Sequence, residues 1–442
     1  MTNQELSSQE KRAEIFADWL SPKDIEFVDE KAKEAYKKRA QRLIDVVNLK
    51  QPDKVPVIPN VGFFPAFYAE MTPEDIMYDY DKFEESYKKY TFDFEPDAYK
   101  GSIEAVPGKV FEALGYNLYQ WPRNGTPAET SYQCVEDEYM KPEDYDALID
   151  DPTDFWLRRY LPRICDELRP LQNLGALTSI IEMPFTPPAL IPFGTPDVQS
   201  ALKSLMEAGE RALEWFEAAN SINTQIISAG YPLFMGGGSK APFDILADTL
   251  RGTQAAMLDM FRRPEKLQEA MERLTPLALK MGINSATVNN NPFVFMPLHK
   301  GADSFMSREQ FKEFYWPTLN KVINGLIEEG LVPLLFAEGA YNERLDIIKE
   351  DIPKASTLWM FDKTDMRKAN EILGDTACIA GNVPSSLMST GDPKDVRSYC
   401  KELIEDVGEN GGFILTTGAV TDEAKPENIE AMIEAGKEYG VY

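Results

Sequence analysis

Four polar residues end short apolar runs in the last third of the chain and are the best candidates for chemistry: His299, Glu338, Asp362 and Asn382. His299 is the only histidine among 442 residues, and an imidazole can donate a proton, hold an anion or ligate a metal. A desolvated Glu338 carboxyl group would have a raised pKa and would suit general acid catalysis. Asp362 and Asn382 could orient a ligand through hydrogen bonds. The alternative role for Glu338 is structural, in a contact with a helix N-terminus or an ion pair with Arg344.

The apolar runs before these residues are typical of buried parallel strands. They lie at 292–298, 332–337, 356–361, 377–381 and 412–416, with turns and helical stretches between them. In a barrel of alternating strands and helices, functional groups lie where the strands stop, at the C-terminal face. We therefore expect the four polar side chains to face one barrel mouth.

Further candidate strands precede this region, at 55–59, 94–101, 175–181 and 232–235. The run at 175–181 ends at Glu182, another strand-and-carboxylate pair, whereas 224–228 could be strand or helix. About eight strands alternating with helices favour a closed ring over an open sheet. The sequence therefore predicts an α/β protein, a (β/α)8 TIM barrel over residues 51–442 with an N-terminal helical extension over residues 1–50.

An aromatic loop follows the first strand and contains Phe63, Phe64 and Tyr68. These rings could form a substrate-binding wall or could simply cover the core. Cys378 lies inside its strand and is predicted to be a buried core residue rather than a metal ligand. Trp359 has the opposite pleat direction to Asp362 and is predicted to pack on a helix.

The composition limits the class of partner. The formal net charge is −27, from 46 Lys plus Arg against 73 Asp plus Glu, and no basic stripe suggests a nucleic-acid partner. No apolar run approaches the roughly 20 residues that span a bilayer. The first residues lack the apolar core of a signal peptide. A soluble, cytoplasmic protein without a membrane partner is therefore expected.

Several segments resemble the uroporphyrinogen decarboxylase superfamily. The resemblance is carried by Leu43-Ile44-Asp-Val-Val-Asn before the first strand, Gly381-Asn382-Val383-Pro384-Ser385-Ser386-Leu387, Gly411-Gly412-Phe413-Ile414-Leu415, and Pro426-Glu427-Asn428. It spans roughly residues 40–442 and implies a single (β/α)8 barrel, in agreement with the strand pattern.

Departures from the superfamily pattern narrow the activity that the resemblance implies. True uroporphyrinogen decarboxylases carry an arginine-rich loop after the first strand, where this chain has residues 62–68 without arginine. They also carry a catalytic aspartate after the second strand, where this chain reads Tyr99-Lys100-Gly101-Ser102. Methyltransferases that act on coenzyme M hold zinc with a His-x-Cys pair and a later cysteine. Phe336, Glu338 and Ala419 occupy the aligned positions here.

The remaining branch contains the methyltransferase components of O-demethylases, which residues 297–301 and Glu338-Gly339-Ala340-Tyr341 resemble. The resemblance implies transfer of methyl from a methoxyaromatic substrate to Co(I) of a corrinoid (cobalamin) protein. His299, Glu338, Asp362 and Asn382 would be catalytic. The substrate-binding residues would be Phe63, Phe64, Tyr68, Glu182 and Tyr341.

Several alternatives stay open. His299 and Glu338 could instead hold a metal such as zinc, which would polarise the ether oxygen. The chain could be a decarboxylase for a smaller substrate or a non-catalytic binder of corrinoid or tetrapyrrole. Tetrahydrofolate is a further possible methyl acceptor.

Overall fold

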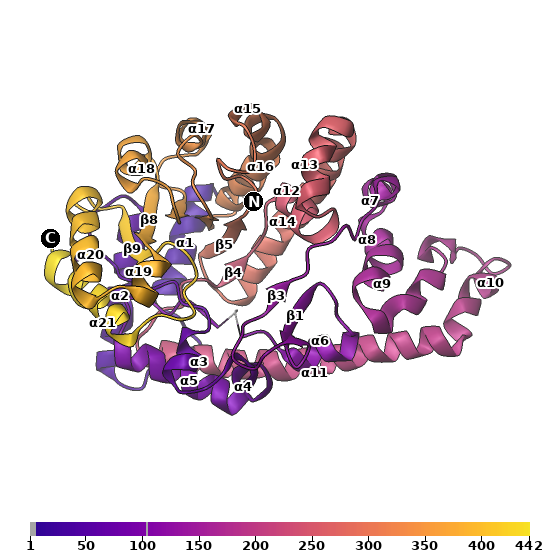
Figure 1. Cartoon of the computed structure of the whole chain (residues 1–442), viewed down its shortest axis with the longest axis horizontal. Helices are drawn as coiled ribbons and strands as arrows, with labels where there is room; N and C mark the ends of the chain where they lie inside the picture. Colours follow the sequence, from indigo (N-terminus) through magenta and orange to yellow (C-terminus); the bar gives the residue numbers. More distant parts are fainter. Residues whose placement is uncertain (1–5, 103–104) are drawn as a thin grey trace, which may run out of the picture.

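The computed structural model describes residues 6–102 and 105–442 and contains a six-stranded parallel sheet (Figure 1). In spatial order the strands are β4 (Gly237–Gly238), β5 (Phe293–Leu298), β6 (Val332–Ala337), β7 (Leu358–Phe361), β8 (Cys378–Val383) and β9 (Phe413–Thr417). All neighbours in this order are parallel, so every strand ends at the same edge. The strands predicted from residue 292 onward are confirmed.

Two extended segments join the ends of this sheet. Residues 55–61 lie beside β9 and are bound to it by backbone hydrogen bonds and parallel bridges. Residues 97–100 lie between that segment and residues 232–235, with backbone hydrogen bonds at Asp97 and Tyr99. Since residues 232–235 lead directly into β4, eight extended segments form one ring. The predicted (β/α)8 architecture is confirmed.

Alternate side chains fill the interior of the barrel, as the two-residue period of a strand requires. The inward residues are Ile58, Ala98, Phe234, Phe293, Val332, Leu334, Phe336, Leu358, Met360, Cys378, Ala380 and Ile414. Cys378 is thus a core residue, as predicted. Helices α1 (Ser8–Leu20) and α2 (Glu30–Val47) close the amino end, where the rings of Trp19 and Phe293 lie 5.5 Å apart.

Helices cover the outside of the ring (Figure 1). They include α12 (Pro242–Asp244), α13 (Thr253–Arg262), α14 (Pro264–Val288), α15 (Arg308–Gln310), α16 (Trp316–Glu328), α17 (Leu345–Asp351), α18 (Met366–Leu373), α19 (Ser385–Thr390), α20 (Pro393–Val407) and α21 (Pro426–Tyr439). The outward strand residues pack on this layer. Trp359 of β7 lies 6.4 Å from Trp316 of α16, measured between ring centroids, which confirms its predicted direction.

The chain leaves the barrel between residues 105 and 231, and we call this excursion the arm. It contains α6 (Gly108–Leu114), β1 (Tyr119–Pro122), β2 (Gly125–Thr126), β3 (Gln133–Cys134), α7 (Tyr145–Asp150), α8 (Pro152–Phe155), α9 (Leu161–Ile164), α10 (Thr186–Leu190) and α11 (Pro196–Ser228). Figure 1 shows α10 at the end farthest from the barrel and α11 running back along the whole arm.

The arm corrects one predicted strand and decides another. Residues 175–182 form turns, including the short helix η4 (Leu177–Ser179), and almost all of them are exposed. The apolar run has no neighbouring strand to pair with, so its backbone does not become a barrel strand. Residues 224–228 belong to α11, and the helical alternative was correct. No helix in the described part of the chain is both long and apolar enough to cross a membrane.

Candidate active site

Register brings His299 and Glu338 together at the carboxyl edge of the barrel. Leu298 of β5 pairs with Ala337 of β6, so the next residue of each strand lies beside the other. Nε2 of His299 is 3.7 Å from Oε2 of Glu338. Both side chains are partly open to solvent, with exposed fractions of 30% and 43%. The two residues singled out in the sequence therefore do converge at one mouth.

The second nitrogen of His299 is held by an aspartate. Nδ1 lies 2.5 Å from Oδ2 of Asp248, in the π-helical turn η6 (Ile245–Leu250). The sequence analysis missed Asp248. The available signal was Lys240, Asp244 and Asp248, three charged residues at four-residue intervals in an otherwise apolar stretch, because that spacing places side chains on one helix face.

Asp244 fixes the turn in which His299 lies. Its carboxylate accepts the backbone N–H groups of His299 at 3.0 Å and Lys300 at 3.1 Å. It also accepts the Tyr315 hydroxyl at 2.8 Å. Asp244 is completely buried, and burial together with the nearby charge of Asp248 raises its pKa. The backbone position of the histidine is therefore set by a side chain that the solvent does not reach.

Two lysines also contact the Asp248 carboxylate. Nζ of Lys240 is 2.8 Å from Oδ2, and Nζ of Lys300 is 3.2 Å from Oδ1. Burial alone would raise the pKa of Asp248, but the hydrogen bond with His299 and the charge of Lys240 outweigh burial and hold the pKa well below its ordinary value. Asp248 is thus a stable anion beside the imidazole.

The surroundings of His299 favour its protonated form. Burial lowers the pKa of the imidazole, but the hydrogen bond and charge of Asp248, with the charges of Asp244 and Glu338, outweigh burial and raise it above its usual value. Burial raises the pKa of Glu338, the charge of His299 opposes this, and Asp362 and Asp248 add to it. The pKa values of His299 and of the neighbouring Glu338 carboxyl group are therefore both raised, so each group retains its proton more readily than usual.

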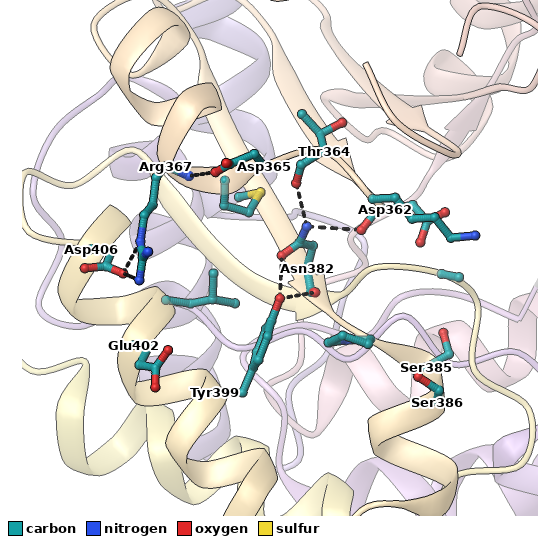
Figure 2. Close-up of a pocket in the computed structure, with 15 residues that line it drawn as sticks. Asp362, Thr364, Asp365, Arg367, Asn382, Ser385, Ser386, Tyr399, Glu402 and Asp406 are labelled. Atoms are coloured by element: carbon teal, nitrogen blue, oxygen red, sulfur yellow. Dashed lines mark hydrogen bonds and ion pairs between the residues drawn. The ribbon is translucent and has the colours of Figure 1, made fainter. Parts of the chain in front are cut away.

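Asp362 and Asn382 end the next two strands and stabilise the same rim. Oδ2 of Asp362 accepts the backbone N–H of Gly339 at 3.0 Å, directly after Glu338. Asn382 donates to the carbonyl groups of Asp362 and Thr364 and accepts from the Tyr399 hydroxyl (Figure 2). The Asn382 amide is fully engaged, so its geometry supports a positioning role for the loop after β7.

A groove of about 730 Å³ adjoins these two residues on the outer side of the rim. Figure 2 shows Asn382 at its centre, between the start of α18 and the side of α20. Arg367 and Asp406 form an ion pair across it. The groove is lined by residues of both charges together with apolar side chains such as Met366 and Leu403.

The predicted aromatic wall is mostly structural. Phe64 and Tyr68 lie in the short helix α3 (Phe64–Tyr68), after which the chain forms α4 (Pro73–Tyr78) and α5 (Tyr80–Phe94). Both rings pack against Phe94 of α5, and Tyr68 donates to Asp93. Phe63 is buried as well and packs toward the arm, with its ring 5.8 Å from that of Tyr132. One turn of helix points successive rings in different directions, which the sequence pattern does not reveal.

Two other predicted substrate contacts also lie elsewhere. Tyr341 has no exposed surface and donates its hydroxyl to the Leu298 carbonyl. Glu182 is exposed in the arm, in the segment just before α10, and no barrel strand precedes it. Arg344 donates to the backbone carbonyls of Gly301 and Met306, and its ionic partner is Asp303 at 3.5 Å, so the predicted ion pair with Glu338 is wrong.

The arm approaches the site through the hairpin of β1 and β3. Burial raises the pKa of Tyr119 to about 12, with added contributions from Cys134 and from Asp248. Burial and the charge of Asp248 likewise raise the pKa of the Cys134 thiol. The negative charge of Asp248 therefore raises the pKa of both side chains, which places the hairpin near the Asp248–His299 pair. All four cysteines are free thiols.

Comparison with known proteins adds a family and a fold. The family model described as uroporphyrinogen decarboxylase (URO-D) matches residues 164–439. A uroporphyrinogen decarboxylase of Dichelobacter nodosus is 23% identical over 242 residues, which cover 53% of this chain and 67% of that protein. One from Methylococcus capsulatus is 33% identical over 78 residues, only 17% of this chain and 22% of that protein.

Among solved structures, a methyltransferase from Methanosarcina mazei shares the fold. Its TM-score is 0.60 at 16% identity, over 92% of this chain and 98% of that one. This likeness agrees with the ring of eight extended segments described above.

Proposed function

Because the chain belongs to the uroporphyrinogen decarboxylase (URO-D) family, we propose that it transfers a methyl group from a methoxylated aromatic compound to Co(I) of a separate corrinoid protein. The observation that carries this proposal is the Asp248–His299–Glu338 arrangement at the barrel mouth. The fold shared with a methyltransferase supports the reaction class. The family name alone would suggest decarboxylation, so the site chemistry decides between the two.

In the cleavage of a phenyl methyl ether, the group that the enzyme itself must supply is a proton donor. The corrinoid acceptor supplies a very strong nucleophile when its protein is docked. Phenolate is a poor leaving group, so the ether oxygen must be protonated as the bond to the methyl carbon breaks. The balanced outcome is one phenol, one methyl–cobalt bond and one proton consumed from the enzyme.

His299 is the residue best suited to give that proton. Its Nδ1 is fixed by Asp248, so Nε2 is the nitrogen directed toward Glu338 and the mouth. The raised pKa of His299 favours the protonated form of Nε2. Asp248 remains ionised and stabilises the imidazolium. Its hydrogen bond to Nδ1 also orients the ring, as a carboxylate does for the general acid of other enzymes. The 30% exposure of the imidazole allows reprotonation from water after each turnover.

Glu338 influences the protonation of His299 through its charge, and Asp362 restrains the position of Glu338. Glu338 lies 3.7 Å from Nε2, where an ether oxygen entering the site would compete for the same proton. Asp362 holds the backbone after Glu338 and thereby limits the movement of its carboxyl group.

A zinc ion fits these residues poorly. His299 and Glu338 offer two donors, whereas catalytic zinc sites use three protein ligands. Within residues 6–102 and 105–442, no group of three or more His, Cys, Asp or Glu side chains is arranged to hold a metal. The proposed step is therefore built on proton donation from the chain itself.

Decarboxylation of a polycarboxylate would call for arginines at the mouth. The three buried arginines among the described residues serve other contacts. Arg42 binds Asp53 and Asp97, Arg251 binds Asp259 and Glu138, and Arg344 binds the loop after β5. The lysines near His299 are engaged with Asp248. This arrangement favours a neutral aromatic ether over a polyanionic substrate.

The direct experiment follows cobalt while the chain meets a methyl donor. The purified protein is mixed with a reduced corrinoid protein and a series of methoxyphenols and methoxybenzoates, and the Co(I) spectrum is recorded. We expect Co(I) to convert to methyl-Co(III) with at least one donor and to release the matching phenol. Tetrahydrofolate in place of the corrinoid protein tests the other acceptor. If the protein binds the corrinoid but no donor methylates it, the proposal is wrong and the protein is a non-catalytic binder.

A further inference from the structure

Asn60 ends the first extended segment of the barrel and carries a buried amide that no described residue satisfies. The residue is 2% exposed, and among the described residues neither its Oδ1 nor its Nδ2 has a hydrogen-bond partner. The other buried asparagines differ, because Asn291 and Asn382 use both groups of their amides and Asn428 donates to backbone carbonyls. A buried amide without a partner destabilises a fold, so its presence indicates a partner from outside the chain.

The backbone of Asn60 is fixed by β9 and the segment that follows it. Its N–H donates to Oγ1 of Thr417 at 3.2 Å, and its carbonyl accepts the N–H of Thr421 at 2.9 Å. Both bonds use the main chain of residue 60 and would form with any residue except proline. They hold the side chain in one place but do not account for the amide.

The neighbours of Asn60 in the chain show which way the amide points. Val57 and Val61 belong to the layer between the strands and the outer helices, whereas Ile58 belongs to the barrel interior. Successive side chains alternate between the two faces of an extended segment, so Asn60 is directed inward, above Ile58. The amino end of the interior is filled by core side chains and closed by α1 and α2. A partner for the amide therefore enters from the mouth at which His299 lies.

Two further buried polar side chains flank Asn60 on the adjacent strands. Thr416 lies two residues after the inward Ile414 of β9 and is 2% exposed. Lys100 is 4% exposed, and its Nζ donates to the carbonyl of Val61 at 3.0 Å, which places the ammonium group beside residue 60. This part of the mouth is therefore built from hydrogen-bonding groups rather than from apolar core.

The order of the ring places Asn60 across the mouth from the proposed proton donor. Residues 55–61 are the first of the eight extended segments, and β5 and β6, which His299 and Glu338 follow, are the fourth and fifth. In a closed ring of eight, the first segment lies opposite the fifth. An eight-stranded barrel is wide enough to hold one small ligand. An aromatic ether whose methoxy group lies at His299 would therefore turn the far end of its ring toward Asn60.

The amide itself selects the chemistry of the group that it binds. Nδ2 needs an acceptor and Oδ1 needs a donor, and a hydroxyl group is both. An ether oxygen or a carboxylate only accepts, so it would leave Oδ1 without a partner. We infer that Asn60 binds a hydroxyl group at the far end of the ring, so that the substrate class is a hydroxylated methoxyarene. The role of that ring as a methyl donor rests on the proposed function.

Binding, measured apart from methyl transfer, tests this inference. Equilibrium dialysis compares 4-methoxyphenol with 4-methoxytoluene, in which a methyl group of similar size replaces the hydroxyl. We expect the wild type to bind 4-methoxyphenol about tenfold or more tightly, because only this compound pairs both groups of the amide. In Asn60→Leu the difference should fall to about twofold or less. Equal or absent binding by the wild type overturns the inference, as does a preference that persists in Asn60→Leu. Tighter binding of 4-methoxybenzoate through Asn60 would likewise exclude the hydroxyl.

Thermal stability gives a second measurement that needs no substrate. Leucine resembles asparagine in shape, so Asn60→Leu should keep or raise the Tm by removing an unpaired buried amide. Asn291→Leu is the matched control. The Asn291 amide donates to the Leu233 carbonyl at 2.7 Å and accepts the Phe293 N–H at 2.9 Å, so its loss should lower the Tm by about 2 °C or more. An equal loss in Asn60→Leu would show that the Asn60 amide is structural and would overturn the inference.

The cobalt assay separates this inference from the proposed function. If 4-methoxyphenol binds through Asn60 but no donor methylates cobalt, the proposed reaction is wrong and the hydroxyl site stands. If 4-methoxyphenol and 4-methoxytoluene methylate cobalt with equal kcat/KM, the reaction stands and the role of Asn60 is wrong.

Discussion

Leu334 in strand β6 and Ile181 in the arm are aliphatic residues in similar apolar runs, but Leu334 is fully buried and Ile181 is 68% exposed. The run around Leu334 has a parallel strand on each side, which satisfies its backbone and surrounds its side chains. The run around Ile181 has neither. The comparison between barrel and arm shows that an apolar run is buried only where the fold supplies neighbouring strands. Apolar sequence alone does not determine whether the run becomes a barrel strand.

The same comparison separates the chemistry of the two regions. Every residue proposed to act in catalysis lies at or beside the ends of barrel strands, where loops are supported by a rigid ring. Residues 175–196 at the tip of the arm have exposed apolar side chains and a single ionisable group, Glu182. Substitutions in the two regions should therefore affect different measurements, and five predictions follow from the largest expected effect to the smallest.

The largest effect is expected at the barrel mouth. His299→Asn should lower the rate of methyl transfer roughly 10²- to 10⁴-fold, the range expected for loss of a general acid. The measurement is the initial rate of methyl-cobalt formation. Leu213→Asp on the arm is the control and should keep the wild-type rate per chain. A rate within a factor of a few of wild type for His299→Asn would remove the histidine from the proposed step.

The next effect concerns stability. Leu334→Ala should lower the free energy of unfolding by about 2–5 kcal/mol, because it leaves a cavity in the barrel interior. Ile181→Ala should change it by less than about 0.5 kcal/mol, because the side chain is exposed. Denaturant titration followed by circular dichroism gives both values. Equal losses at the two positions would mean that the outer arm is part of the core of a single chain.

The third prediction tests the pH dependence. The pKa of His299 is raised, so the active protonated form is present at low pH and lost as pH rises through that pKa. Asp248→Asn removes the main cause of the increase, so the alkaline limb of the kcat/KM profile should move to lower pH by about one unit or more. The free energy of unfolding should follow the same pH dependence. The stabilisation contributed by His299 is complete below its unfolded pKa of about 6.5 and disappears as pH rises through its folded pKa. An unchanged limb would show that another group titrates.

Glu338 should produce a smaller change. Its side chain is 43% exposed and lies 3.7 Å from the imidazole, so screening by solvent limits its influence. Glu338→Gln should shift the alkaline limb in the same direction as Asp248→Asn, but less, and should lower kcat/KM by no more than about fivefold. A loss as large as that of His299→Asn would identify Glu338 as the proton donor instead.

The smallest effect is expected at Glu182. Its side chain is exposed in the arm and is preceded by turns rather than a barrel strand. Glu182→Ala should leave the KM for the methyl donor and the initial rate unchanged within error. A raised KM with unchanged kcat would indicate that the arm closes over the barrel mouth during the reaction.

The site was predictable from the sequence only in part, for a physical reason. His299 and Glu338 follow two consecutive parallel strands of equal pattern, so their proximity follows from register alone. Asp248 comes from the helical turn that follows the neighbouring strand β4 and is 51 residues away in the chain, so no local pattern links it to His299. Phe64 and Tyr68 illustrate the converse, since their residue types suit a ligand but their packing on α5 uses their surfaces for the core.

Periodicity in the sequence determined the alternation of strands and helices, the inward direction of Cys378 and the outward direction of Trp359, because side-chain direction repeats with the backbone. Tertiary structure alone decided which carboxylate meets the lone imidazole, which aromatic rings are buried, and that an apolar run became an arm. Those outcomes depend on contacts between different elements of the chain, such as the contact between Asp248 and His299, and no local pattern encodes the energies of these contacts.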